Sequence, residues 1–165
     1  DDQIAGIMGH EVGHVAAVHA RERMSMQIAS QGAVLGGTLI GSSLFSGKCD
    51  NVAAAQRRSC VDGANRNTQM LVTALGLGSQ IGILLPYSRR HETESDKLGV
   101  NYMQRAGYDP YQAVRLWEKM AADSPSRQPQ FLSTHPDPAV RAQVLNDYIV
   151  RQERLGSRGF RNINT

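Results

Sequence analysis

The stretch Gly9-His10-Glu11-Val12-Gly13-His14 decides how the rest of this sequence is interpreted. On a helix, residues four apart share one face, so His10 and His14 can hold a single metal ion between them. Glu11 lies beside this pair, where a carboxylate can take a proton from a metal-bound water. The stretch therefore predicts a helix that carries two metal ligands and a general base.

The composition is that of one globular domain, with 165 residues, 41% of them hydrophobic and 20% charged. The net charge of +3 is spread along the chain, and the basic pairs Arg57-Arg58 and Arg89-Arg90 lack interleaved aromatic residues. This pattern argues against a nucleic-acid-binding protein. Because the sequence has no initiator methionine and no signal peptide, we expect that it continues from a longer or processed protein.

Cys49 and Cys60 are the two cysteines, and both lie in a polar segment, residues 47–67. A pair that closes a short loop suggests a disulfide and hence an oxidising compartment such as the periplasm. The alternative is two free thiols. A structural zinc site is disfavoured, because no second pair of ligands follows at the required spacing.

Apolar residues at near-helical spacing predict one long helix over residues 2–31. Its glycines, Gly6, Gly9 and Gly13, cost helix propensity, a cost that makes sense if another backbone or a ligand approaches closely. The metal-binding face of this helix is therefore expected to be crowded.

Two apolar stretches rich in small residues, 33–45 and 70–85, predict the arms of a helical hairpin over residues 33–86, with the cysteine loop at its tip. Each arm is shorter than the roughly twenty apolar residues that span a membrane. We therefore favour two helices packed through small residues over insertion into a membrane, with contact to a bilayer surface as a further alternative.

Turn and cap residues divide the chain after the hairpin, residues 86–165, into further helices. Pro86 is expected to end the second arm, and Gly107 to end a helix over residues 91–105. Asp109 and Asp137 each precede a proline and predict N-caps of helices over 110–122 and 138–155. Residues 156–165 are expected to form a flexible tail. No stretch shows strand alternation, so the predicted fold is mainly α.

A catalytic zinc needs a third protein ligand besides two histidines. His19 would lie on about the opposite side of an unbroken helix from His10, so it is expected to be a packing or surface residue. Glu92 and Asp96 share a helical face, so one can bind the metal while the other accepts a proton from a ligating imidazole. From spacing alone, Glu94 and His91 stay open as alternatives to Glu92.

The chain resembles peptidase family M48, which includes HtpX-like and BepA-like bacterial envelope proteases and CAAX prenyl proteases. The resemblance rests on the His-Glu-x-x-His motif and on Arg90-His91-Glu92-Thr93-Glu94-Ser95-Asp96-Lys97-Leu98-Gly99, Ala106-Gly107-Tyr108-Asp109-Pro110 and Ser133-Thr134-His135-Pro136. It implies zinc ligands His10, His14 and Glu92, with Asp96 behind them. Ser95 stands where the family usually has alanine.

The resemblance also assigns roles late in the chain. His135 would reach the metal as a reversible latch, and Arg141 would lie near the site. Alternatively, His135 and Arg141 would both act as catalytic residues that stabilise the oxyanion of the reaction. The family usually has a β-strand segment upstream of the metal helix, and this part is missing from these 165 residues.

These expectations combine into a gluzincin-type zincin catalytic domain over residues 1–155, with the hairpin as a lid. The resemblance implies a zinc endopeptidase with one Zn²⁺ per chain, located in the periplasm or at its membranes and active in envelope protein quality control. Its partners would be protein or peptide substrates and envelope assembly proteins, with no nucleic acid. The alternative is a zinc-stabilised, chaperone-like interaction module whose metal is latent or capped by a fourth protein ligand. A membrane-embedded prenyl-protein protease would need longer apolar helices than those predicted.

Overall fold

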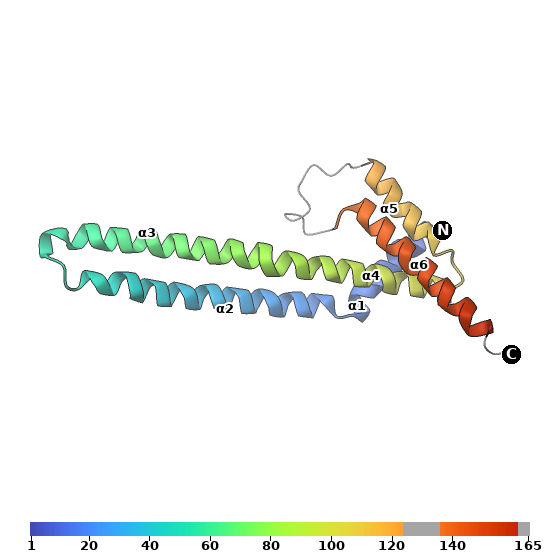
Figure 1. The fold of residues 1–165 in the computed structure, drawn as a ribbon, viewed down its shortest axis with the longest axis horizontal. Helices are drawn as coiled ribbons and strands as arrows, with labels where there is room; N and C mark the ends of the chain where they lie inside the picture. Colours follow the sequence, from blue (N-terminus) through green and yellow to red (C-terminus); the bar gives the residue numbers. More distant parts are fainter. Residues whose placement is uncertain (124–135, 162–165) are drawn as a thin grey trace. The chain divides into compact units, whose positions relative to one another are not determined.

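The structure, a computed structural model, describes residues 1–123 and 136–161. These residues form helices joined by short connections and include no strand (Figure 1). The predicted mainly α fold is therefore confirmed. The chain divides into two compact units, Asp1–Arg21 with Tyr87–Thr165, and Glu22–Pro86.

The predicted single helix over residues 2–31 is wrong, because the chain breaks between α1 (Asp2–Ala16) and α2 (His19–Ser46). At the break, Val18 has a φ of 52°. This left-handed conformation is unfavourable for a β-branched residue, so the local sequence does not favour it. The break brings His19 into the interior, where only 1% of its surface is exposed.

Helix α1 packs against α4 (Leu85–Arg105) through its glycine face. A Cβ atom on Gly9 would lie 2.9 Å from the carbonyl oxygen of Gly99, and one on Gly13 would lie 2.7 Å from Oγ of Ser95. The Ser95 hydroxyl donates a hydrogen bond to the carbonyl oxygen of His10. The predicted close approach of another backbone at these glycines is confirmed.

The apolar side chains of α1 lie on the other side of that helix and are largely exposed. Ile4 and Met8 are 64% and 59% exposed, and they line an open cavity of about 480 Å³ together with Tyr102 and Tyr108. The helix therefore buries its small residues and leaves its large apolar ones at the surface.

The core of the same unit lies between α4, α5 (Tyr111–Asp123) and α6 (Pro138–Arg161). The helix boundaries follow the predicted signals: Gly107 has a φ of 82°, and the carboxylates of Asp109 and Asp137 accept hydrogen bonds from the first turns of α5 and α6. Helix α6 extends to Arg161, past its predicted end at residue 155. The buried core residues are Val100, Met103, Ala113, Val114, Ala142, Leu145 and Ile149.

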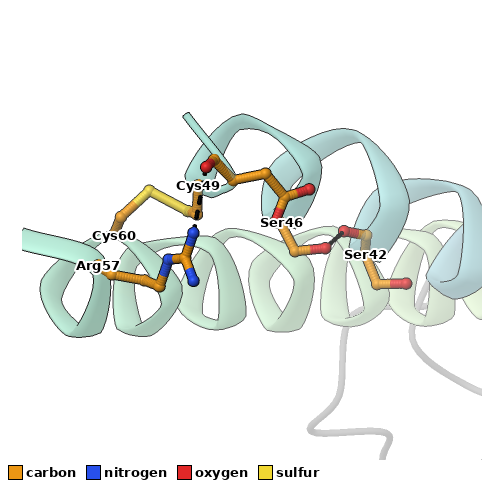
Figure 2. Close-up of a disulfide and its surroundings, with 6 residues drawn as sticks. Ser42, Ser46, Cys49, Arg57 and Cys60 are labelled. Carbon is orange, nitrogen blue, oxygen red and sulfur yellow. Dashed lines mark hydrogen bonds between the residues drawn. A yellow bond between two sulfur atoms is a disulfide. The ribbon is translucent and has the colours of Figure 1, made fainter. Parts of the chain in front are cut away.

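The second unit is a hairpin in which α2 and α3 (Ala54–Ser79) run side by side (Figure 1). Its tip is the short helix η1 (Gly47–Cys49), and Cys49 is joined to Cys60 by a disulfide, as predicted (Figure 2). The Arg57 side chain donates to the carbonyl oxygen of Asp50 at 3.1 Å. The polar segment 47–67 is not a loop throughout, because α3 begins at Ala54.

The two arms pack through small residues, as predicted. A Cβ atom on Gly41 would lie 2.6 Å from Cδ2 of Leu71, and Leu75 packs against Gly37 in the same way. The predicted arm lengths are wrong, however. The helical stretches His19–Cys49 and Ala54–Arg105 are each long and apolar enough to cross a membrane.

Pro86 does not end the second arm. The helix continues from α3 through the π-helical turn η2 (Gln80–Leu84) into α4. Proline lacks the N–H that would bond the carbonyl four residues earlier, and a π-helical turn changes the backbone pairing locally. We attribute the continuity at Pro86 to this wider turn directly before it.

Candidate metal centre

Three side chains with metal-ligating atoms converge between α1 and α4. Nε2 of His10 lies 3.1 Å from Nε2 of His14, and each of these atoms lies 3.5 Å from a carboxylate oxygen of Glu92. All three residues offer ligand atoms within 4.8 Å of one another. Two imidazole nitrogens and one carboxylate are the donor set of a catalytic zinc site, so these residues fit that ion.

Asp96 fixes the orientation of His10. Its Oδ1 atom lies 2.9 Å from Nδ1 of His10. Because an ionised carboxylate only accepts hydrogen bonds, Nδ1 of His10 is the donor and Nε2 keeps its lone pair for a metal. Asp96 therefore contacts His10, and its predicted role behind a metal ligand stays a prediction.

Arg141, on α6, bonds to both acidic residues of the site. Its Nε and Nη2 atoms donate to the Asp96 carboxylate at 2.8 and 2.7 Å, and Nη1 lies 3.2 Å from Glu92. The guanidinium also stacks on the Trp117 ring, 3.5 Å from its centroid. Nη2 lies 3.2 Å from Nδ1 of His10, a contact between two donors rather than a hydrogen bond. Arg141 therefore pairs with two buried carboxylates and offsets one of their two negative charges.

His19 is a neighbour of the site that sequence reasoning missed. Its Nδ1 atom lies 2.9 Å from Nδ1 of His14, and its Nε2 atom lies 3.5 Å from Oε2 of Glu94. The expectation that His19 lies on the opposite side of the helix assumed an unbroken helix. The break at Val18 removes that assumption, and no signal in the sequence marks it.

The remaining candidates lie as follows. Glu94 contacts His19, and its side chain is 60% exposed. The buried ring of His91 stacks on His19, with the ring centroids 4.1 Å apart. Glu11 is exposed on α1, next in sequence to His10. His135 lies outside the described residues, so its predicted role stays a prediction.

The pKa values of the two histidines move in opposite directions. Burial by itself lowers the pKa of His10, but hydrogen bonds to Asp96 and Glu92 outweigh burial and raise that pKa to about 9. For His14, burial is the largest effect and the pKa falls below its ordinary value. Asp96 thus orients His10 but also stabilises its protonated form.

This shift predicts pH-dependent zinc binding. A protonated imidazole cannot bind a metal, and the folded protein raises the pKa of His10 from 6.5 to about 9, so protons compete with zinc throughout the range below pH 9. We expect the apparent zinc affinity of chelator-treated protein to rise roughly tenfold per unit between about pH 6.5 and 8.5. Competition with a chromophoric chelator measures it, and a flat profile would contradict the prediction.

A helix that bears His-Glu-x-x-His, completed by a glutamate from a second helix, defines the metal site of a zinc metalloprotease. The sequence model of peptidase family M48 matches residues 1–149, and the chain belongs to this family. The family suggested by the sequence motifs is therefore confirmed.

Curated relatives come from several cellular settings. The chain is 28% identical over 151 residues to the mitochondrial metalloendopeptidase OMA1 of Schizosaccharomyces pombe, covering 90% of this chain and 37% of that protein. It is 27% identical over 143 residues to the beta-barrel assembly-enhancing protease of Escherichia coli K12, covering 86% of this chain and 26% of the relative. Metalloprotease LoiP of the same bacterium is 26% identical over 148 residues, covering 89% and 49%. No solved structure matches the chain.

Proposed function

We propose that this chain is the catalytic region of a zinc-dependent endopeptidase. The observation that carries the proposal is the convergence of His10, His14 and Glu92, with Nδ1 of each histidine already engaged by a neighbouring side chain. This arrangement leaves both Nε2 atoms directed toward the same point. Family membership and the names of the relatives, all called proteases or metalloendopeptidases, support the same activity.

Each side chain has a distinct task in this proposal. His10, His14 and Glu92 hold zinc, which when bound lowers the pKa of water and polarises a carbonyl group. Glu11 accepts a proton from the attacking water and returns it to the amine that leaves. Arg141 keeps the charge of Glu92 balanced, and Asp96 holds His10.

The cellular location of the protein has less support than its activity. The disulfide between Cys49 and Cys60 favours an oxidising compartment, and relatives from Escherichia coli favour the bacterial envelope. We propose the periplasm, with misfolded or stalled envelope proteins as substrates. The mitochondrial relatives favour a mitochondrial location instead. Labelling of an epitope-tagged protein in intact and in permeabilised cells distinguishes the periplasmic location from the mitochondrial one.

Metal removal tests the activity. Full-length protein that has been stripped with a chelator should lose cleavage of an unfolded substrate such as casein. Adding about one equivalent of zinc should restore that cleavage, because the site offers one set of three ligands. Cleavage that persists in protein shown to be free of metal would overturn the proposal.

We further propose that the hairpin inserts into a membrane. Residues 24–47 and 67–88 contain no Asp, Glu, Lys or Arg, and each run is longer than the roughly twenty residues that span the hydrocarbon layer. Large apolar side chains in the arms are exposed, with Leu35 at 62% and Leu44 at 63%. A hairpin of two helices cannot bury these outward-facing side chains by itself, so we propose that the hydrocarbon layer of a membrane surrounds them.

Polar groups within the arms are compatible with lipid. Thr38 donates to the carbonyl oxygen of Val34 at 2.8 Å, and Thr73 donates to that of Gln69 at 2.9 Å. Such bonds to the preceding helical turn leave few unsatisfied hydroxyl groups. The charged residues lie beyond both ends of the runs.

Flotation of the full-length protein with phospholipid vesicles tests insertion. The parent should float and resist extraction by carbonate. Leu35→Arg combined with Leu39→Arg should abolish this behaviour, since both residues are exposed near the middle of the run 24–47 and an arginine costs about 2.5–3.5 kcal/mol at the centre of a spanning helix. Asn51→Arg, at the hairpin tip, is the matched control and should float normally. A parent that remains in the soluble fraction, or a double variant that floats equally well, would contradict insertion.

A further inference from the structure

The buried imidazole of His19 contacts His14, although His19 is not itself one of the three candidate metal ligands. Its Nδ1 atom lies 2.9 Å from Nδ1 of His14, and 1% of the residue is exposed. Its ring stacks on His91 with an interplanar angle of 14° and a centroid distance of 4.1 Å. The stacking and the contact with His14 hold the His19 ring in one orientation.

The short distance between two Nδ1 atoms requires one of them to donate and the other to accept. A zinc ion bound by Nε2 of His14 takes the lone pair of that nitrogen, so the neutral ring carries its proton on Nδ1. Nδ1 of His19 must then be the acceptor. Consequently, the proton of His19 resides on its Nε2 atom.

The far side of His19 is consistent with this assignment. Nε2 of His19 faces the carboxylate of Glu94 at 3.5 Å, where a carboxylate accepts from an N–H group. Both hydrogen bonds thus have the same direction: His14 donates to His19, and His19 donates to Glu94. On the other ligand, Nδ1 of His10 donates directly to Asp96. Each ligating histidine therefore has its own acceptor behind it.

We propose that His19 is a positioning residue for the metal ligand His14, accepting the Nδ1 proton and so holding Nε2 toward the zinc. Glu94 in turn holds the tautomer of His19. This inference rests on the proposed zinc site, and it assigns a role that neither the His-Glu-x-x-His motif nor the set of three ligands provides.

Two variants at one position separate hydrogen bonding from packing. His19→Leu fills a similar volume without an acceptor, whereas His19→Asn keeps an acceptor near the position of Nδ1. In full-length protein, competition with a chromophoric chelator should show about 10- to 100-fold weaker zinc binding for His19→Leu, the usual effect of losing such a partner. His19→Asn should stay within about threefold of the parent. Unchanged binding in His19→Leu, or equal losses in both variants, would overturn the inference.

A measurement on the unmodified protein keeps the inference testable even if His19→Leu fails to fold. Nitrogen-15 NMR of the zinc-loaded protein should show His14 protonated on Nδ1 and His19 protonated on Nε2. Zinc bound through Nδ1 of His14, or a proton on Nδ1 of His19, would overturn this inference alone. A parent that binds no zinc would overturn the proposed function together with it.

Discussion

Replacing Glu11 with glutamine should lower kcat for peptide-bond cleavage by about 10²- to 10⁴-fold, the range that general acid–base catalysis contributes. The amide keeps the size of the side chain but cannot take a proton from water. Because Glu11 is not among the three candidate ligands, zinc content should stay at that of the parent. Casein cleavage and metal analysis on the same preparation of full-length protein measure both quantities.

Glu118→Gln is the matched control for this experiment. Glu118 is also exposed and lies on α5 of the same unit, so its replacement removes an equal charge without touching the metal centre. Cleavage by this control should equal that of the parent. If zinc-loaded Glu11→Gln cleaves as well as the parent, the chain is better explained as a zinc-stabilised interaction module.

Replacing Gly9 with valine should destabilise the unit that carries the metal centre by about 3 kcal/mol, the upper part of the usual range for overpacking. The Cβ atom of the valine would already lie 2.9 Å from the carbonyl oxygen of Gly99, and a backbone atom cannot relieve this contact by changing rotamer. Since His10 and Glu92 lie on the two helices that would separate, zinc binding should weaken as well. Chemical denaturation with and without zinc measures both effects.

Gly156→Val provides the comparison within the same unit. A side chain at Gly156, on α6, meets no heavy atom within 4 Å, so its replacement should change the unfolding free energy by less than about 0.5 kcal/mol. Equal stability of Gly9→Val and the parent would show that α1 and α4 are not in close contact at Gly9.

The sequence was most informative where local chemistry decides the outcome. Glu92 and Asp96 are four residues apart on α4, and this spacing predicted that they share one helical face, whereas the choice of Glu92 over Glu94 and His91 came from the resemblance to family M48. The caps at Asp109 and Asp137 and the left-handed Gly107 also follow from the residues present. In each case the signal is local in the sequence, because it is a spacing within one helix or a residue at the end of a helix.

Other features depend on contacts between distant segments. The position of His19 depends on a left-handed Val18, a conformation that valine disfavours locally and that tertiary packing must impose. Apolar periodicity in α1 also does not identify the face that packs on α4, because the space against α4 admits Gly9 but not a large side chain. Helix continuity through Pro86 required a π-helical turn, which has no sequence signature here.

The proposed activity requires that Glu92 of α4 completes the metal site formed by His10 and His14. Zinc affinity of Glu92→Gln and Glu94→Gln, measured side by side in the full-length protein, tests this claim most directly. We predict that Glu92→Gln binds zinc at least about 100-fold more weakly than the parent, whereas Glu94→Gln stays within about tenfold of it. Normal zinc binding by Glu92→Gln, or a larger loss in Glu94→Gln, would contradict the account.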